Sequence, residues 1–270
     1  MNNFWQRALT GFFFVLIIAG GIWFHAFSFF TVFFVVVIAG VYELYGLISH
    51  SKVNVQFFSS LLLAVGLYVS VFLIQSKISD VSILYLIIPI VSYIFIRELF
   101  KNEDKPFENI ASSLLIACYI GAPFALLNVL AFDNGIYNYV LPLSVFVLVW
   151  INDTGAYLAG VTLGKHKFFE RISPKKTWEG TIGGFVFTLI AASVMSMYWH
   201  ELSIIQWIIF GGIISVTAVL GDLIESMFKR SIGVKDSGTI FPGHGGVLDR
   251  FDAVIFALPM AVVYLELFVR

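Results

Sequence analysis

Long apolar runs, broken by short polar stretches, dominate the chain along its whole length. A run of about 17 to 25 apolar residues is long enough to cross the hydrocarbon core of a membrane as an α-helix. Strands of a membrane barrel would instead show segments of about ten residues with alternating polarity, and these runs do not alternate. In lipid the backbone must satisfy its own hydrogen bonds, which a helix does. We therefore predict nine membrane-spanning helices, with approximate cores at residues 5–24, 27–48, 57–75, 82–97, 109–132, 139–163, 177–199, 203–223 and 251–269.

The composition also indicates a chain embedded in lipid. Hydrophobic residues make up 59% of the 270 residues and charged residues only 12%, whereas a soluble domain carries roughly a quarter charged residues. The single cysteine, Cys118, lies in an apolar run and excludes a disulfide framework or a cysteine-based zinc site within the chain. The predicted fold class is all-α, a polytopic integral membrane protein that forms one membrane domain.

Lysine and arginine are distributed unequally between the two sides that nine helices would define. The N-terminus and the loops after the second, fourth, sixth and eighth segments hold 14 of the 16 basic residues. The opposite side holds Lys77 and Arg270. By the positive-inside rule the basic side is cytoplasmic, which places the N-terminus in the cytoplasm and the C-terminus outside.

Two long polar loops lie on the predicted cytoplasmic side, at residues 164–176 and 224–250. Both are dense in Gly, Lys, Arg, Asp and His, whereas the outer loops are short and carry few charges. Whatever chemistry the chain performs is therefore expected to face the cytoplasm. Within the membrane domain, residues 1–135 are expected to form a scaffold that could shape an entrance from the lipid. Residues 136–270, which contain both loops, are expected to carry the chemistry.

An ionisable residue, Asp153, lies inside the sixth apolar segment. A charge at membrane depth costs at least about 2.5 kcal/mol on insertion scales, and such a residue is a functional candidate by default. Two structural roles would also explain it: capping of a broken helix, or pairing with a basic residue of a loop. We favour the functional interpretation and keep the structural one open.

A second candidate is an anion site at residues 173–180. Ser173 before Pro174 predicts a helix N-cap followed by proline at the first helical position. Free backbone N–H groups at a helix start, beside Lys175 and Lys176, favour anion binding. Ordinary flanking charge on the cytoplasmic side is an equally good explanation of the two lysines.

The densest group of polar residues runs from Gly221 to Asp252. Asp222 and Glu225 lie three residues apart and share a helix face, and Asp249 and Asp252 do the same. Two helices joined by one loop can bring these pairs together, and clustered carboxylates repel unless a cation neutralises them. Oxygen ligands of this kind suit Mg2+. The sequence therefore predicts a metal site whose ligands are Asp222, Glu225, Asp249 and Asp252.

Glycines and bases fill the loop between the two carboxylate pairs. Glycine lets backbone N–H groups come close to phosphate oxygens, and the bases supply positive charge. Metal-binding carboxylates beside phosphate-binding bases are what phosphoryl or nucleotidyl transfer requires. A salt-bridged cytoplasmic loop that binds no ligand is the alternative. His244 is expected to contact phosphate or to order the turn rather than to ligate the metal, because the neighbouring ligands are oxygens.

A fixed pattern of residues runs through this stretch: Ser226, Lys229, Arg230, Lys235, Asp236, Gly238, Phe241, Pro242, His244, Gly245, Gly246, Asp249, Arg250 and Asp252. The pattern resembles the signature of the phosphatidate cytidylyltransferase family, also called CDP-diacylglycerol synthases. Residues 152–157 and 173–180 also resemble that family, so the similarity is specific from about residue 150 to residue 252. Before residue 150 the resemblance is one of hydropathy only.

The resemblance implies transfer of a cytidylyl group from CTP to phosphatidic acid, which gives CDP-diacylglycerol and pyrophosphate. It implies Mg2+ at the carboxylates and allows a second cation, either Mg2+ or a monovalent ion such as K+. The candidate catalytic residues are Asp222, Asp249, Lys229 and Arg230. The candidate substrate-binding residues are Asp153, Ser173, Lys175, Lys176, Lys235, Asp236, His244, Gly245, Gly246 and Arg250.

The resemblance also implies a homodimer in the inner membrane, with CTP, phosphatidic acid and membrane lipids as partners and no nucleic acid. A CTP-dependent lipid-alcohol kinase would share the metal and nucleotide but transfer the γ-phosphoryl group, and the full signature argues against it. An ion-coupled transporter would show paired halves with interrupted helices, whereas the polar residues here cluster in the C-terminal half. A structural membrane subunit would have no use for so many clustered acids and bases.

Overall fold

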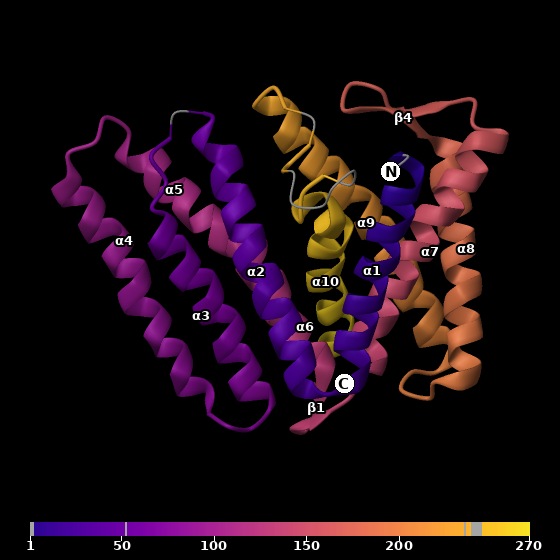
Figure 1. The fold of residues 1–270 in the computed structure, drawn as a ribbon. Coiled ribbons are helices and arrows are strands. Elements are labelled where there is room, and N and C mark those ends of the chain that lie inside the picture. Colours follow the sequence, from indigo (N-terminus) through magenta and orange to yellow (C-terminus); the bar gives the residue numbers. More distant parts are fainter. Residues whose placement is uncertain (1–2, 52, 235, 239–244) are drawn as a thin grey trace. The chain divides into compact units, whose positions relative to one another are not determined.

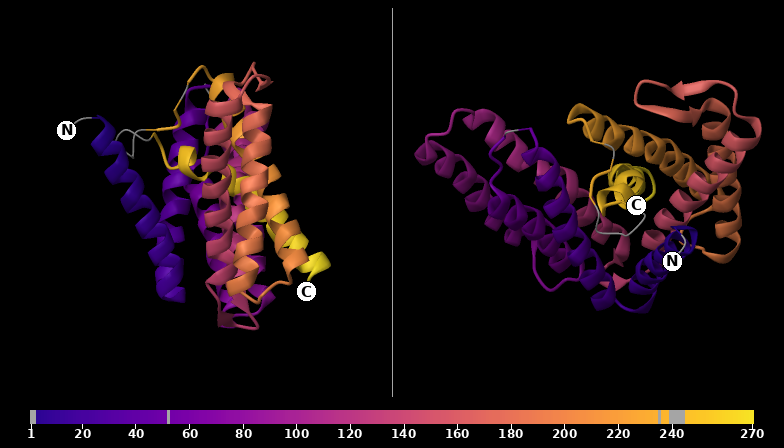
Figure 2. Two further views of the ribbon diagram at one scale, coloured as in Figure 1. Left: turned by 90° about the vertical axis from the view of Figure 1, so that its right-hand side faces the viewer. Right: turned by 45° about the horizontal axis from the view of Figure 1, so that its top comes forward.

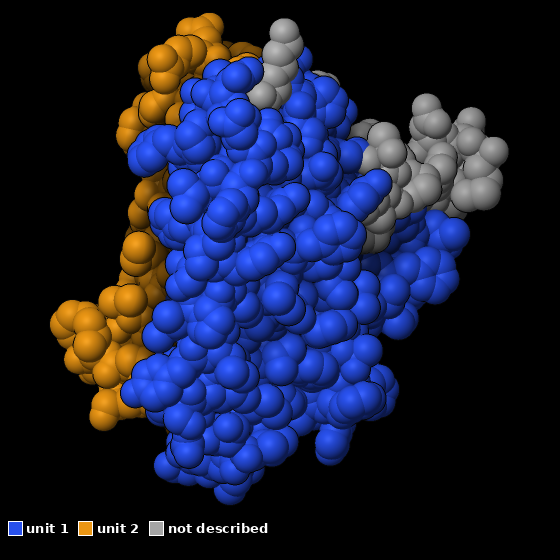
Figure 3. All heavy atoms as spheres, turned by 90° about the vertical axis from the view of Figure 1, so that its left-hand side faces the viewer, with its two compact units in different colours: residues 1–139, 232–250 blue, residues 140–231, 251–270 orange. Residues whose placement is uncertain are grey.

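The computed structural model describes residues 3–51, 53–234, 236–238 and 245–270, and helices dominate it (Figure 1). The chain separates into two compact units, which Figure 3 colours blue and orange. Unit 1 contains residues 1–139 and 232–250. Unit 2 contains residues 140–231 and 251–270. Part of the signature stretch therefore belongs to the same unit as the N-terminal helices.

Unit 1 is built mainly from the helices of the first half of the chain. These are α1 (Asn3–Phe24), α2 (Ala26–Ser49), α3 (Phe57–Gln75), the 3-10 helix η1 (Val81–Leu86), α4 (Ile87–Lys101), α5 (Pro106–Ile116), the π-helical turn η2 (Ala117–Gly121) and α6 (Ala122–Ala131). A short antiparallel hairpin follows, made of β1 (Phe132–Asp133) and β2 (Ile136–Tyr137). Its turn residues, Asn134 and Gly135, both have positive φ, which is the conformation that an Asn-Gly turn favours.

The helices α5, η2 and α6 form one continuous helical stretch, Pro106–Ala131. Pro123 follows the π-helical turn closely. Because proline cannot donate to the carbonyl four residues earlier, the wider turn accommodates it without breaking the helix. Gly121 packs this stretch against α3, since a Cβ at that position would lie 2.7 Å from Ala64 Cα. The fifth predicted segment is therefore one distorted span.

Unit 2 is a bundle of long helices with one hairpin. Its elements are α7 (Val140–Leu163), β3 (Lys167–Phe169), β4 (Ser173–Thr177), α8 (Trp178–Tyr198), α9 (Ile204–Ser231) and the part of α10 (Leu248–Phe268) from Phe251 onward. α7, α8 and α9 pack side by side (Figure 2). A Cβ at Gly184 would lie 2.7 Å from Asn152 O, and one at Gly221 would lie 2.5 Å from Asp252 O. Glycine thus lets α8 approach α7, and α9 approach α10.

The predicted fold class is confirmed. Eight helices of the described residues are long and apolar enough to cross a membrane, and a shorter apolar helix, Leu9–Phe24, precedes them. Each of the nine predicted segments falls on one of these helical stretches. The chain is an all-α, polytopic integral membrane protein.

The predicted loop at residues 224–250 is too long. α9 continues to Ser231, and α10 already includes the last three residues of that range. Glu225 and Lys229 form an ion pair at i,i+4 spacing, which supports the helix beyond its apolar run. The first residue after α9 with a left-handed backbone is Gly233, whose φ is +75°. The helix therefore ends where glycine allows the chain to turn.

The N-cap predicted at Ser173 is wrong. Ser173–Thr177 is strand β4, which pairs antiparallel with β3. Pro174 fits this strand because a two-stranded sheet has only edge strands, which tolerate proline. The N-cap of α8 is Thr177, whose side chain accepts from the N–H of Gly180 at 3.2 Å. The loop at residues 164–176 is thus a hairpin that leads into a helix start.

Candidate active site

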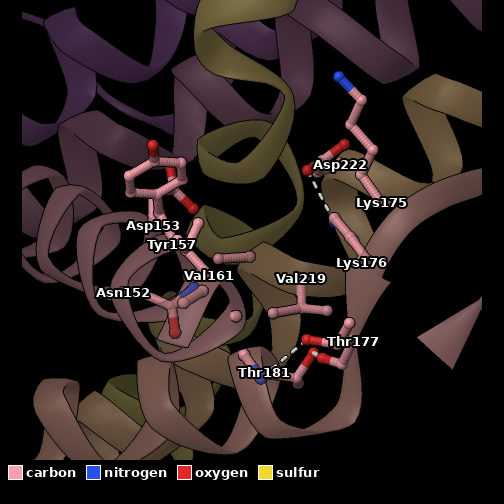
Figure 4. Close-up of a pocket in the computed structure, with 14 residues that line it drawn as sticks. Asn152, Asp153, Tyr157, Val161, Lys175, Lys176, Thr177, Thr181, Val219 and Asp222 are labelled. Atoms are coloured by element: carbon pink, nitrogen blue, oxygen red, sulfur yellow. Dashed lines mark hydrogen bonds and ion pairs between the residues drawn. The ribbon is translucent and has the colours of Figure 1, made fainter. Parts of the chain in front are cut away.

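A cavity of about 420 Å³ lies within unit 2, lined by α7, β4, α8 and α9 (Figure 4). Four of the predicted site residues line it: Asp153, Lys175, Lys176 and Asp222. They come from three separate parts of the sequence, so the fold of unit 2 is what brings them together. The rest of the lining is largely apolar or small, with Val161 and Gly160 as examples.

An ion pair between Lys176 and Asp222 spans the cavity wall (Figure 4). Lys176 Nζ lies 2.7 Å from Asp222 Oδ2, and the hydroxyl of Ser226 donates to Asp222 Oδ1 at 3.2 Å. The two ion-paired side chains are 23% and 38% exposed. A ligand in the cavity can therefore approach both charges.

Glu179, in the first turn of α8, anchors the hairpin that carries the lysines. Its carboxylate accepts from the N–H groups of Lys165 and His166 at 3.1 and 3.2 Å, and it contacts His166 Nδ1 at 2.5 Å. The N–H of Trp178 also donates to His166 O at 2.9 Å. An acidic side chain is favourable at a helix N-terminus, where the helix dipole is positive. These contacts fix the base of the hairpin against the helix start.

The base of the cavity depends on close helix packing. Gly160 on α7 and Gly180 on α8 both line the cavity. A Cβ at Gly180 would lie 3.2 Å from Gly160 Cα and 2.9 Å from Ala156 O. These glycines therefore serve helix packing, which is the role that small-residue spacing indicates.

Asn152 is a cavity residue that sequence reasoning did not select. It is 1% exposed, and its Oδ1 accepts from the hydroxyl of Ser215 on α9 at 2.5 Å. The hydroxyl of Thr188 on α8 lies 3.5 Å from the same oxygen. Because the oxygen is engaged, the amide presents its nitrogen, a donor, to its remaining surroundings. A polar amide inside an apolar segment was the signal available in the sequence.

Three of the four predicted metal ligands, Asp222, Glu225 and Asp252, belong to unit 2. Asp252 on α10 lies within electrostatic range of Asp222, Glu225 and Asp153. Glu225 is buried, and its Oε2 lies 2.8 Å from Nζ of the equally buried Lys229. Among the residues that the structure describes, no three His, Cys, Asp or Glu side chains form a complete metal site by themselves.

Asp249 has a different setting, inside unit 1. Its Oδ2 accepts from the N–H of Ser237 at 3.0 Å, from the Ser237 hydroxyl at 2.9 Å and from the N–H of Gly246 at 2.8 Å. Gly245 has a φ of +81°, and a Cβ there would collide with the same carboxylate. Asp249 therefore organises the chain that enters α10.

Of the other predicted residues, those that the structure describes do not line the cavity of unit 2. Ser173 is half-buried at the start of β4. Lys235 and His244 lie outside the described residues. Three predicted residues are exposed at the surface: Arg230, Asp236 and Arg250.

Sequence reasoning missed Glu43, a carboxylate on α2. It is 5% exposed, and its Oε2 accepts from the N–H of Leu248 at 2.8 Å, within unit 1. An ionisable residue inside the second apolar segment was the available signal, as it was for Asp153. The scaffold assigned to the first half of the chain therefore contacts the signature stretch directly.

Comparison with known families shows to which family this chain belongs. The sequence model of the Cytidylyltransferase family matches residues 5–268. The chain belongs to the cytidylyltransferase family. The predicted family is confirmed. The match also includes the first half of the chain, where the resemblance seen in the sequence was one of hydropathy only.

Several cytidylyltransferases of staphylococci are similar to this chain. The phosphatidate cytidylyltransferases of Staphylococcus aureus (strain COL) and Staphylococcus saprophyticus are 44% identical over 167 residues. That of Staphylococcus haemolyticus is 42% identical over the same length. Each match covers 61% of this chain and 62% of the relative.

Proposed function

We propose that this cytidylyltransferase transfers a cytidylyl group from CTP to phosphatidic acid and releases pyrophosphate. The names of its staphylococcal relatives support the choice of substrates. The observation that carries the proposal is the cavity of unit 2, which Lys175, Lys176, Asp153 and Asp222 line together within a bundle of apolar helices. Such a cavity offers two positively charged side chains to a triphosphate, and it lies among helices that are apolar enough to be in contact with lipid.

In this reaction a phosphate oxygen of phosphatidic acid attacks the α-phosphorus of CTP in line. A bond forms between that oxygen and the α-phosphorus, while the bond from the α-phosphorus to the bridging oxygen of the β-phosphate breaks. Pyrophosphate leaves with that oxygen. The lipid phosphate is already ionised near pH 7, so no general base is required. The protein must align the two phosphates and balance their charge, which we assign to Lys175 and Lys176.

The carboxylates of unit 2 fit a hard divalent cation. Asp222, Glu225 and Asp252 supply oxygen donors, and the repulsion around Asp252 falls when a cation binds among them. We assign Mg2+ to Asp222 and Asp252. When bound, Mg2+ neutralises charge on phosphate oxygens. A ligand role for Asp249, and a second cation such as K+, stay predictions from the sequence.

The lipid is proposed to enter from the side of the bundle. Tyr157 and Val161 line the cavity, and both are strongly exposed on the α7 surface. An apolar rim that is open to the surroundings suits an acyl chain, while the phosphate reaches Lys176. We therefore place the lipid entrance at this part of α7 in the inner leaflet.

We further propose a homodimer in the inner membrane, with the N-terminus in the cytoplasm and the C-terminus outside. The bias of Lys and Arg supports the orientation, and the family resemblance supports the dimer. Single cysteines introduced near either end of a Cys118→Ser chain, labelled in intact cells with a membrane-impermeant maleimide, test the orientation. Labelling at the C-terminus but not at the N-terminus is expected. Light scattering of the detergent-solubilised protein tests the dimer.

Purified protein in detergent, given phosphatidic acid, Mg2+ and CTP labelled at either the α- or the γ-phosphate, tests the reaction. We expect the α label to enter the lipid and the γ label to leave in pyrophosphate, with EDTA stopping both. Asp222→Asn should lower the rate at least about 100-fold, as loss of a group that stabilises charge does. Asp104→Asn, a change at an exposed acid outside the cavity, is the matched control.

Two other outcomes would replace the proposal. A γ label transferred to a lipid alcohol would identify a CTP-dependent kinase. No transfer of either label by protein that is folded, under conditions where a known cytidylyltransferase is active, would favour a transporter.

A further inference from the structure

Glu43 contacts the signature stretch from nearly two hundred residues earlier in the sequence. Its Oε2 accepts from the N–H of Leu248 at 2.8 Å and lies 3.4 Å from the hydroxyl of Ser237. All three residues belong to unit 1. Among the described residues, no hydrogen-bond donor reaches Glu43 Oε1, which is also buried. A carboxylate in this setting is costly, so its presence calls for a gain elsewhere.

Two glycines of the signature stretch make room for this carboxylate. A Cβ at Gly238 would lie 2.6 Å from Glu43 Oε1, and a Cβ at Gly246 would lie 2.5 Å from the same oxygen. Real Cβ atoms do not approach an oxygen so closely. The sequence suggested that glycine here serves phosphate approach, and the contacts give these two positions a second reason to be glycine.

Glu43 and Asp249 hold the same short piece of chain from two directions. The Ser237 hydroxyl has one proton, and the shorter contact, 2.9 Å, runs to Asp249 Oδ2. Gly246 donates to Asp249, while Leu248, two residues later, donates to Glu43. Moving Glu43 would therefore move the residues that orient Asp249.

We propose that Glu43 is a positioning residue, which fixes Asp249 at the start of α10 through Leu248, Ser237 and the two glycines. The proposal takes Asp249 as a catalytic residue, as the sequence predicts, and it rests on the proposed function for the activity that is measured below. Glu43 itself touches neither substrate nor metal in this role. The first half of the chain thus holds the residues around Asp249 in place within unit 1.

Hydrogen exchange of the purified protein tests the contact without any assay of activity. In Glu43→Ala the amides of residues 245–250 should exchange at least about tenfold faster, because Leu248 loses its acceptor, while those of α7 stay unchanged. Glu98→Gln is the matched control. It alters another buried acid of unit 1, which accepts from Gln56 and Asn109 instead. Equal exchange of residues 245–250 in Glu43→Ala and wild type would overturn the proposal.

Cytidylyl transfer, measured over a range of Mg2+ concentrations, separates positioning from general support of the fold. Removing a partner that orients a catalytic carboxylate typically costs about 10- to 100-fold in metal affinity or activity. We expect Glu43→Ala to lose activity in this range while its thermal midpoint stays near that of Glu98→Gln. A loss of stability with unchanged activity per folded molecule and unchanged Mg2+ dependence would contradict the proposal.

A pair of substitutions tests the role of the glycines. Gly238→Ala should be nearly inactive because its Cβ meets the carboxylate of Glu43. Glu43→Asp shortens that side chain by one methylene, so the double variant should be more active than Gly238→Ala alone. Additive losses would show that the two positions do not communicate. An inactive wild type with the expected exchange pattern would instead remove the proposed function and leave the positioning contact intact.

Discussion

Lys176 Nζ lies 2.7 Å from Asp222 Oδ2, and this ion pair joins the β3–β4 hairpin to α9. Both side chains line the same cavity and keep part of their surface exposed. In the proposed reaction a substrate phosphate can bind Lys176 and a metal cation can bind Asp222, so that each replaces the partner of the ion pair. The pair thus keeps two opposite charges together until the substrates arrive.

Removal of the positive charge of Lys176 should lower the reaction rate far more than it lowers the stability of the fold. Lys176→Met keeps the length of the side chain but loses its charge, and we expect the rate of cytidylyl transfer to fall about 100-fold. Lys176→Arg should retain a larger share, since it keeps the charge. The measurement is the steady-state rate at saturating phosphatidic acid with CTP varied.

Lys101→Met is the control for that change, because Lys101 pairs with Glu103 at 2.8 Å at a similarly exposed position away from the cavity. It should leave the rate near that of wild type, as exposed ion pairs contribute little. Equal rates for Lys176→Met and Lys101→Met would exclude Lys176 from phosphate binding.

The contact between Glu179 and His166 should matter for substrate affinity. Glu179→Ala removes the acceptor of two backbone N–H groups and of the imidazole, so the hairpin loses its fixed base. Since Lys175 and Lys176 lie on that hairpin, we expect the KM for CTP to rise about three- to tenfold with a smaller change in kcat. Glu170→Ala, an exposed acid on the same hairpin, should change neither constant. A fall in kcat alone would contradict this assignment.

Substitution of Gly184 should lower the stability of the protein, because α7 and α8 pack closely at this position. A Cβ there would meet Asn152 O at 2.7 Å, so Gly184→Ala forces the two helices apart. Overpacking of this kind typically costs about 1–3 kcal/mol, and we expect a clear drop in the thermal midpoint in detergent. At Gly46 on α2 a Cβ meets nothing within 4 Å, so Gly46→Ala should keep or raise the midpoint. A lower thermal midpoint for Gly46→Ala than for Gly184→Ala would refute this account of the packing.

The spans could be predicted because polar residues separate the apolar runs so clearly. The boundaries failed where a second signal overrode hydropathy. α9 runs past its apolar core because the Glu225–Lys229 pair lies along the helix. Ser173 and Pro174 form a strand because the hairpin partner, β3, supplies hydrogen bonds that a local N-cap pattern does not reveal. Hydropathy therefore missed an ion pair along one helix, and the local N-cap pattern missed a partner strand.

The residue types that line the candidate cavity could be predicted from the sequence, and their grouping only in part. Asp153, Lys176 and Asp222 line one cavity, and each lies within or beside an apolar segment of the sequence. The contacts of Glu43 were not predictable, since its partners lie 194 and 205 residues away. Asn152 was hidden for a related reason, because the hydroxyl that fixes it comes from α9.

Loss of the hydroxyl that holds Asn152 should free the orientation of this side chain but leave the cavity itself in place. Ser215 donates to Asn152 Oδ1 at 2.5 Å inside the bundle, and Ser215→Ala leaves that oxygen without its closest donor. Such interhelical bonds are worth about 0.6–2 kcal/mol in membrane proteins, so the thermal midpoint should fall slightly. The larger effect should be on the KM for CTP or phosphatidic acid, because the amide can then turn within the cavity that it lines. Ser193→Ala removes a hydroxyl that donates to Leu189 O of its own helix, and it serves as the control. If both variants keep the wild-type KM for both substrates, Asn152 holds the helices together and takes no part in substrate binding.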